Sequence, residues 1–171
     1  MPGLTLDDQL DSVDFALAAF HDDGEWQVQD IASPAFESVE SLSHALRHLP
    51  GAAGAAGAVA LVAVDEDFFI IVRVQGPATR VLLSDITAAD EWELAQSALE
   101  FLGLPMFGDL EDEDVAPAGD LDLLADLGMV AMDMGVLIDD DDLYPDEMLS
   151  EVARSLGFGE LFDDAVGLTS A

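Results

Sequence analysis

The hydrophobic and polar positions first take up a regular order near the N-terminus, where they predict a β-hairpin. An apolar run covers residues 15–20, and an alternating run covers residues 25–31. In the second run Trp26 and Val28 alternate with glutamines, and a period of two is typical of a half-buried strand. The intervening Asp23-Gly24 pair favours the positive φ of a tight hairpin turn.

Two later stretches repeat apolar residues at three- and four-residue spacing and predict amphipathic helices. The first follows Ser38 and is ended by the pair Pro50-Gly51. The second follows Asp90, which we expect to be the N-cap with Glu93 three residues on, and it ends at Gly103. The apolar faces are Val39, Leu42, Ala45, Leu46 and Leu49 in the first helix and Trp92, Ala95, Ala98, Leu99 and Leu102 in the second.

Three apolar runs between these helices predict strands over residues 58–64, 68–74 and 80–86. Short turns join the three runs, and strands with short connections pair antiparallel. With the hairpin and the helices they give the order β-β-α-β-β-β-α, an α+β fold in which helices cover one face of an antiparallel sheet. Longin and roadblock-type domains have this order, and that likeness concerns topology alone.

The rest of the chain predicts short helices after an acidic linker. Residues 105–119 contain Pro, Gly and the acidic run 111–114, a composition typical of a linker. We expect Asp120 to cap one helix and a second helix to start near Pro145, a favoured first-turn position. The apolar positions are Leu121, Leu124 and Leu127 in the first helix, Met148, Leu149, Val152 and Leu156 in the second, and Phe158, Leu161 and Phe162 beyond it.

These patterns divide the chain into four parts. A disordered leader is expected over residues 1–12, an α+β sheet domain over 13–104, an acidic linker over 105–119, and an acidic helical region over 120–171. The length of 171 residues suits one domain with a helical appendage. We expect the helical region to be docked on the sheet domain.

The charge of the chain changes this picture. The sequence has 37 acidic and 4 basic residues, a formal net charge of −33, together with 51% hydrophobic residues and a mean hydropathy of +0.31. Acidic disordered chains are poor in apolar residues, so this chain is expected to fold. All of its basic residues are arginine, whereas proteins that bind nucleic acid neutralise phosphates with many lysines and arginines. We therefore expect no direct binding to DNA, RNA or an anionic membrane.

The absence of cysteine removes further classes of function. A chain without cysteine forms no disulfide and has neither a thiol nucleophile nor a cysteine zinc site. The N-terminus lacks the basic and apolar regions of a signal peptide, and the uncharged stretch 48–64 is too short and too rich in Gly and Ala to span a bilayer. We expect a soluble cytoplasmic protein.

Two clusters invite a metal-binding interpretation without supporting it. His44 and His48 lie four residues apart on the first helix, but no third ligand is in evidence. The acidic run 139–142 would begin a calcium loop ending at Glu151, but Pro145 stands where such a loop needs Gly. We predict a solvent-facing histidine pair and a solvated acidic loop, with weak calcium binding left as an alternative.

No motif indicates an enzyme. The segment from Gly51 to Gly57 is rich in glycine, but it follows a helix and opens a strand, the reverse of a phosphate-binding loop, and it has no lysine. Gly-x-Ser-x-Gly is absent. Among so many carboxylates no acid–base pair stands out. We therefore expect a non-catalytic protein with no cofactor and no bound metal.

Several segments resemble one known family. They are the run from Val13 to Phe20, Asp-Gly-Glu-Trp at 23–26, the strand pair 60–74, the stretch 82–89, and Tyr-Pro-Asp-Glu-Met-Leu-Ser-Glu at 144–151 leading to Leu-Gly-Phe-Gly at 156–159. From about Val13 to Asp164 the chain resembles the tRNA adenosine deaminase-associated proteins. The resemblance implies a link to a tRNA-specific adenosine deaminase. The chain cannot itself be that deaminase, because the zinc deaminase signature includes Pro-Cys-x-x-Cys.

Resemblance and charge together lead to our main hypothesis, a non-catalytic accessory protein that contacts a basic tRNA-handling enzyme such as the adenosine deaminase, as a regulator or as a mimic of the tRNA surface. More than half of the acids lie after Leu104, where Arg154 is the one basic residue. Acidic segments there would attract the partner, and Tyr144 and Met148 would add apolar contacts if they are exposed. For any one of these residues, core packing of Met148 or simple solvation of the carboxylates is the more expected role. The candidate partner-binding residues are Asp109, Glu111, Asp112, Glu113, Asp114, Asp139, Asp140, Asp141, Asp142 and Tyr144.

The acidity and the topology also fit two further interpretations. The acidity could serve solubility or adaptation to high salt, although this does not explain its concentration near the C-terminus. A longin-like scaffold that homodimerises through its sheet or helix, unrelated to tRNA, is the alternative from another class. A charge-driven contact weakens with ionic strength and an apolar dimer does not, so salt dependence distinguishes the partner contact from the scaffold.

Overall fold

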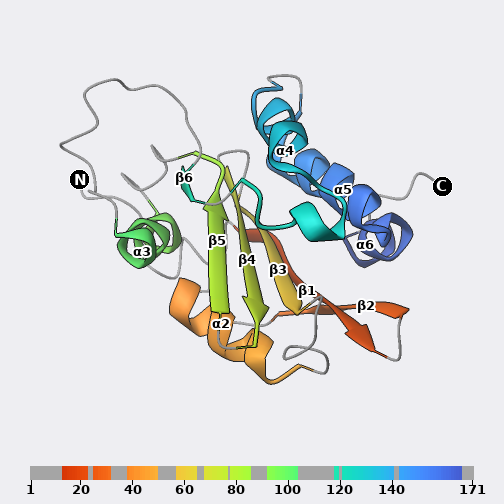
Figure 1. Ribbon diagram of the computed structural model, residues 1–171, viewed down its shortest axis with the longest axis horizontal. Coiled ribbons are helices and arrows are strands. Elements are labelled where there is room, and N and C mark those ends of the chain that lie inside the picture. The colour runs from red at the N-terminus through yellow and green to blue at the C-terminus, as the bar shows by residue number, and fades with distance from the viewer. Residues whose placement is uncertain are drawn as a thin grey trace.

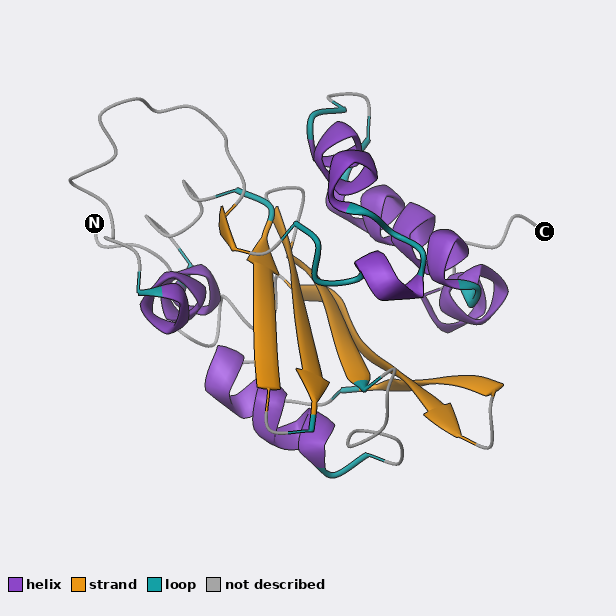
Figure 2. Ribbon diagram, viewed as in Figure 1, coloured by secondary structure: helices purple, strands orange, loops and turns teal. Residues whose placement is uncertain are grey.

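In the computed structural model of this chain, a six-stranded antiparallel sheet lies between two groups of helices (Figures 1 and 2). The structure describes residues 13–22, 25–31, 38–49, 57–64, 68–76, 78–85, 92–103, 118–119, 121–140 and 143–166. Its strands are β1 (Val13–Asp22), β2 (Glu25–Asp30), β3 (Ala58–Val64), β4 (Phe68–Gln75), β5 (Ala78–Leu83) and β6 (Ala118–Gly119). Its helices are α2 (Val39–Arg47), α3 (Glu93–Leu102), the 3₁₀ helix η2 (Ala125–Leu127), α4 (Ala131–Ile138), α5 (Pro145–Leu156) and α6 (Gly159–Val166).

The predicted α+β fold is confirmed. The strand order is β2-β1-β3-β4-β5-β6, and every neighbouring pair is antiparallel. The predicted hairpin is β1 and β2, and the three predicted central strands are β3, β4 and β5. β5 ends at Leu83, three residues short of the prediction. Ser84 N still donates to the Phe69 carbonyl oxygen at 3.1 Å, but Phe69 N donates to Ser84 Oγ at 2.9 Å, so a side chain accepts the bond that a backbone carbonyl accepts in a regular ladder.

The sixth strand falls inside the segment 105–119 that the sequence predicts as a linker. β6 consists of Ala118 and Gly119, which pair with Leu83 and Leu82 of β5. Gly119 has φ +107°, and a Cβ there would lie 2.1 Å from the carbonyl oxygen of Val81. Glycine therefore permits the close approach that joins this short strand to the sheet edge.

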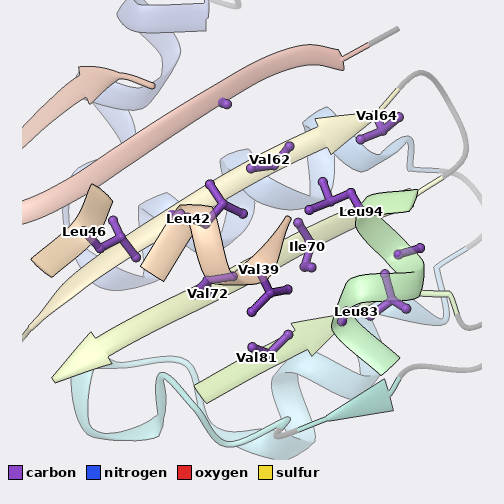
Figure 3. Packing of buried hydrophobic residues seen from close by; sticks show 14 of the residues in the cluster. Val39, Leu42, Leu46, Val62, Val64, Ile70, Val72, Val81, Leu83 and Leu94 are labelled. Atoms are coloured by element: carbon purple, nitrogen blue, oxygen red, sulfur yellow. The ribbon is translucent and has the colours of Figure 1, made fainter. Parts of the chain in front are cut away.

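One face of the sheet is covered by α2 and α3 through hydrocarbon contacts (Figure 3). Buried residues of this first cluster include Val39, Leu42 and Leu46 from α2, Val62, Val64, Ile70, Val72, Val81 and Leu83 from the strands, and Leu94 from α3. Ser38 is the N-cap of α2 as predicted, and its Oγ accepts a hydrogen bond from Ser41 N at 3.1 Å.

The start of α3 differs from the prediction. Trp92, not Asp90, is the N-cap, and it makes no side-chain capping bond. Trp92 is buried, with its ring centroid 6.1 Å from that of Phe68. Burial of this large aromatic side chain fixes the point at which the helix begins, and the free energy gained by burial outweighs the usual preference for a polar N-cap residue. Asp90 lies outside the described residues.

The opposite face of the sheet is covered by α5, α6 and the inner side of α4, which Figure 1 shows across the sheet from α2 and α3. Its buried cluster joins Leu61, Phe69 and Ile71 of the strands to Met134, Leu149, Val152, Phe158 and Phe162 of the helices. Because helices pack on both faces, every residue of β3 is buried. The hairpin also contacts this group, since Trp26 Nε1 donates to the carbonyl oxygen of Leu156 at 3.1 Å.

The C-terminal elements partly match their prediction. α5 begins at Pro145 as expected, and Met148, Leu149, Val152 and Leu156 are buried. The prediction of a helix directly after Asp120 is wrong: residues 121–123 form turns, Leu124 forms an isolated β-bridge with Met129, and the 3₁₀ helix η2 follows. Asp120 itself lies outside the described residues. α4 had no sequence prediction. No helix in the described ranges is both long enough and apolar enough to cross a membrane.

Candidate functional site

Two arginines face the C-terminal region from the sheet. Arg73 of β4 and Arg80 of β5 stand directly opposite each other in the antiparallel ladder. Like charges at opposed positions destabilise a sheet unless other groups compensate them. Both arginines are compensated by carboxylates of one short segment, since Arg73 pairs with Asp126 and Arg80 pairs with Asp122.

The Arg73–Asp126 pair contains the buried arginine. The Arg73 side chain is 0% exposed, and its guanidinium donates two bonds to the Asp126 carboxylate, Nη1 to Oδ1 at 2.6 Å and Nη2 to Oδ2 at 2.9 Å. Nη1 also donates to the carbonyl oxygen of Leu123 at 2.7 Å. Two parallel charge-assisted bonds fix both direction and distance, so the pair positions η2 on the sheet.

Asp126 responds to this neighbour. The hydrogen bonds from Arg73 hold the pKa of the Asp126 carboxyl below its ordinary value, and desolvation opposes that shift only in part. The Asp126 side chain is 54% exposed, so it joins the buried guanidinium to the solvent. The Arg80–Asp122 contact, 3.0 Å between Nη2 and Oδ1, is more exposed on both sides and is the weaker of the two.

The third pairing lies between α5 and α6. Arg154 Nη1 is 3.1 Å from Glu151 Oε2, and Nη2 is 3.7 Å from Asp163 Oδ2. Ser150 Oγ donates to the same Asp163 at 2.8 Å. These groups, with Leu143 and Glu147, line an open cleft of about 240 Å³.

Each of the four arginines makes a polar contact with another residue of the same chain. Arg73, Arg80 and Arg154 contact carboxylates that follow residue 118, and Arg47 donates to Thr79. The sequence has no lysine to add positive charge at the surface. In the described part of the C-terminal region the one cation, Arg154, is already paired, so carboxylates and apolar side chains dominate the surface there.

The predicted partner-binding residues divide into two groups. Asp139 and Asp140 are exposed directly after α4, and Tyr144 is 54% exposed at the N-cap of α5, where its amide donates to Glu147 Oε1 at 3.0 Å. The others, Asp109, Glu111, Asp112, Glu113, Asp114, Asp141 and Asp142, lie outside the described residues. Met148, the other candidate apolar contact for the partner, is 9% exposed on the inner side of α5, as its place on the predicted apolar face of that helix requires.

The metal candidates are also located. His44 and His48 are exposed on α2 with their Nε2 atoms 3.2 Å apart, which matches the predicted solvent-facing pair. Glu151, which would complete a calcium loop, contacts the Arg154 guanidinium instead. In the part of the chain that the structure describes, no three His, Cys, Asp or Glu residues come together as a metal site.

One exposed surface was not predicted from the sequence. On α4, Met132 is 79% exposed and Val136 is 67% exposed, while Met134, Leu137 and Ile138 are buried. The available signal was the run 129–138, in which Asp133 is the one charged residue. A helix with a single charged residue has more apolar residues than one buried face can hold, so some of them remain exposed.

Comparison with known proteins shows the family to which the sequence belongs. The family model described as Rv3753c-like tRNA adenosine deaminase-associated protein matches residues 14–159. "Protein Rv3753c" of Mycobacterium tuberculosis (strain ATCC 25618 / H37Rv) is 38% identical over 147 residues, which cover 85% of this chain and 83% of that protein. No solved structure matches the chain. The resemblance found in the sequence is confirmed, and the chain belongs to the family of Rv3753c-like tRNA adenosine deaminase-associated proteins.

Proposed function

We propose that this protein is a non-catalytic accessory protein that binds a basic tRNA-handling enzyme through its acidic C-terminal surface. The family description names a tRNA adenosine deaminase as the associated protein, and we take the deaminase of the same genome as the partner. One observation carries the proposal: the arginines of the sheet and of α5 are paired internally, while acids after residue 118 face the solvent.

The distribution of charge supports a contact with a basic surface. Asp133, Asp139 and Glu147 are exposed, and no basic residue occurs between Arg80 and Arg154. A potential of one sign over a whole region attracts a partner of opposite sign and speeds the encounter. It also fixes the orientation of approach, because the first half of the chain carries less of the charge and more of the arginines.

Mimicry of tRNA follows from the same chemistry. An enzyme that binds tRNA has lysines and arginines at the sites of the phosphates, and carboxylates can occupy those sites. We propose that the exposed acids compete with tRNA for part of the enzyme surface. The protein would then regulate access of tRNA to the enzyme without a chemical step of its own.

The test is co-purification of this protein with the deaminase encoded by its own genome, at low and at high salt, with tRNA as competitor. The proposal expects a complex at low salt that high salt dissociates and that excess tRNA displaces. Absence of a complex at every salt concentration would reject the proposal and would favour a homodimeric scaffold unrelated to tRNA.

Matched variants assign the effect to the acidic surface. Replacement of Asp140, Asp141 and Asp142 by Asn removes three charges after α4, and this variant is expected to bind more weakly and more slowly. Replacement of the exposed residues Glu25, Glu40 and Glu100 by Gln removes three charges from the sheet domain, and this control is expected to bind as the unmodified protein does. Equal losses would mean that only total charge matters.

A further inference from the structure

The outer side of α4 carries an apolar surface that the C-terminal packing leaves uncovered. Met132 and Val136 are one helical turn apart, so their side chains lie on the same face. They are 79% and 67% exposed, and the preceding Val130 is 46% exposed. Gly135 has open space beside it, since a Cβ at that position would meet no atom within 4 Å. We call Val130, Met132 and Val136 the α4 face.

Acidic residues border the α4 face. Asp133 lies on the helix itself, and Asp139 and Asp140 follow its last turn. Two backbone hydrogen bonds follow the helix: Asp140 N donates to the Leu137 carbonyl oxygen at 3.2 Å, and Leu143 N donates to the Asp140 carbonyl oxygen at 3.3 Å. The second of these bonds keeps the exposed Tyr144, which follows Leu143, near the C-terminal end of α4.

The charge around the α4 face determines which occupant fits. A second copy of this chain also has a net charge of −33 and the same acids around its α4 face, and like charges in an interface oppose association. Anionic lipid is repelled by the same acids. A segment with both apolar and basic side chains gains on both counts, because its apolar residues cover Met132 and Val136 while its lysines or arginines meet the acids.

We propose that the α4 face is the docking surface for a basic amphipathic helix of a partner protein. The proposal rests on the proposed function and specifies how such a partner is bound. Met132 has a flexible, polarizable side chain that adapts to a partner surface, and Val136 is a fixed apolar contact one turn away. With Asp133 between them on the helix and Asp139 at its end, the face recognises alternating apolar and cationic positions of a helix packed across it.

The test uses a synthetic probe in place of the partner. The probe is an amidated peptide of leucine and lysine, about 18 residues long so that it can form a helix, with leucines at helical spacing on one side. The control peptide has the same lysines with serine at each leucine position. Binding to the full-length protein is followed by fluorescence anisotropy and by amide chemical shifts. We expect the leucine peptide to bind and to shift the amides of residues 130–140, and the serine peptide to bind at least about tenfold more weakly.

A pair of double variants separates the α4 face from apolar exposure in general. Met132→Gln with Val136→Gln removes the apolar contacts and keeps good helix formers in α4. Phe101→Gln with Leu161→Gln removes exposed apolar side chains of α3 and α6. The first variant is expected to bind the leucine peptide about tenfold more weakly, and the second is expected to bind it unchanged. Far-UV circular dichroism and amide dispersion show whether both variants are folded.

The outcomes that would overturn the proposal are distinct from those that bear on the proposed function. No binding of the leucine peptide, or equal binding by both double variants, would reject the α4 face even if the deaminase complex forms. Binding to anionic phosphatidylserine vesicles, or dimerisation lost in the Met132→Gln, Val136→Gln variant, would assign the face to another occupant. If no deaminase complex forms but the leucine peptide still binds, the proposed function is rejected and the α4 face remains supported as a docking surface.

Discussion

Different interactions hold the helices on the two faces of the sheet. The face under α2 and α3 is a hydrocarbon cluster, with Leu42 and Leu46 packed on Ile70 and Val72. The face under α4, α5 and α6 combines an equally buried hydrocarbon cluster with the buried guanidinium of Arg73 and its carboxylate partner. The part of the chain with most of the negative charge is therefore positioned by electrostatics as well as by apolar burial.

A physical reason follows from the location of the charge. Acids after residue 118 repel one another, and repulsion within a compact region opposes its folding. Arg73 and Arg80 bring positive charge from the sheet to this region, and Asp122 and Asp126 receive it. The face of the sheet that is covered by the acidic C-terminal region is thus the face where ion pairs offset repulsion between acids.

The largest effect on the difference between the two faces is expected at Asp126. Asp126→Ala leaves the Arg73 guanidinium buried without its carboxylate and should lower the free energy of unfolding by about 2 kcal/mol, less than for a fully buried pair because water reaches the site. Urea denaturation followed by circular dichroism measures this. Asp122→Ala is the control, with an expected loss of about 0.5 kcal/mol. Equal losses would remove the distinction between the buried and the exposed pair.

Part of that effect should depend on pH. Because the pKa of Asp126 is lowered in the folded state, its contribution is complete above the unfolded pKa and is lost as pH falls through the folded value, that is, below about pH 4. The stability difference between the unmodified protein and Asp126→Asn should therefore shrink as pH is lowered through this range. A difference that stays constant down to about pH 2 would contradict the role of the ionised carboxylate.

A smaller change is expected on the hydrocarbon face. Ser38→Ala removes the side chain that accepts a bond from Ser41 N, and loss of an N-cap costs about 1 kcal/mol. Hydrogen exchange should show faster exchange for the amides of α2 and unchanged exchange for those of α5. Faster exchange in α5 would mean that the two faces are coupled more strongly than their separate clusters imply.

The smallest effect is expected at the surface of α5. Glu151→Gln removes the contact with Arg154, which is exposed on both sides, and should change the free energy of unfolding by less than about 0.5 kcal/mol. Thermal denaturation at low salt is the most sensitive measurement, since salt screens such pairs. A loss similar to that of Asp126→Ala would place the stabilising charge contact on α5 instead of on the sheet.

The sheet and its first helix could be predicted because their signals are local. The strand runs 58–64 and 68–74 are almost entirely apolar, which is what burial on both faces requires. Ser38 and Pro145 mark helix starts by their own chemistry. The N-cap at Trp92 could not be predicted in the same way, because tertiary burial and not the local sequence determines it.

The candidate site was harder to predict because its contacts are distant in sequence. A cation inside the apolar run of β4 indicates a buried partner, but the sequence offers 37 acids and does not say which one Arg73 meets. The answer, Asp126, lies 53 residues away. The exposed α4 face was missed for a related reason, since packing decides which apolar residues of a helix with a single charged side chain, Asp133, are left exposed.

The proposed charge-driven contact is tested most directly by titrating this protein with the purified deaminase of its genome in a calorimeter and measuring the dissociation constant over a series of salt concentrations. We expect the affinity to fall steeply with ionic strength, and we expect the replacement of Asp140, Asp141 and Asp142 by Asn to reduce the slope. An affinity that does not depend on salt, or no measurable binding at low salt, would contradict a charge-driven contact.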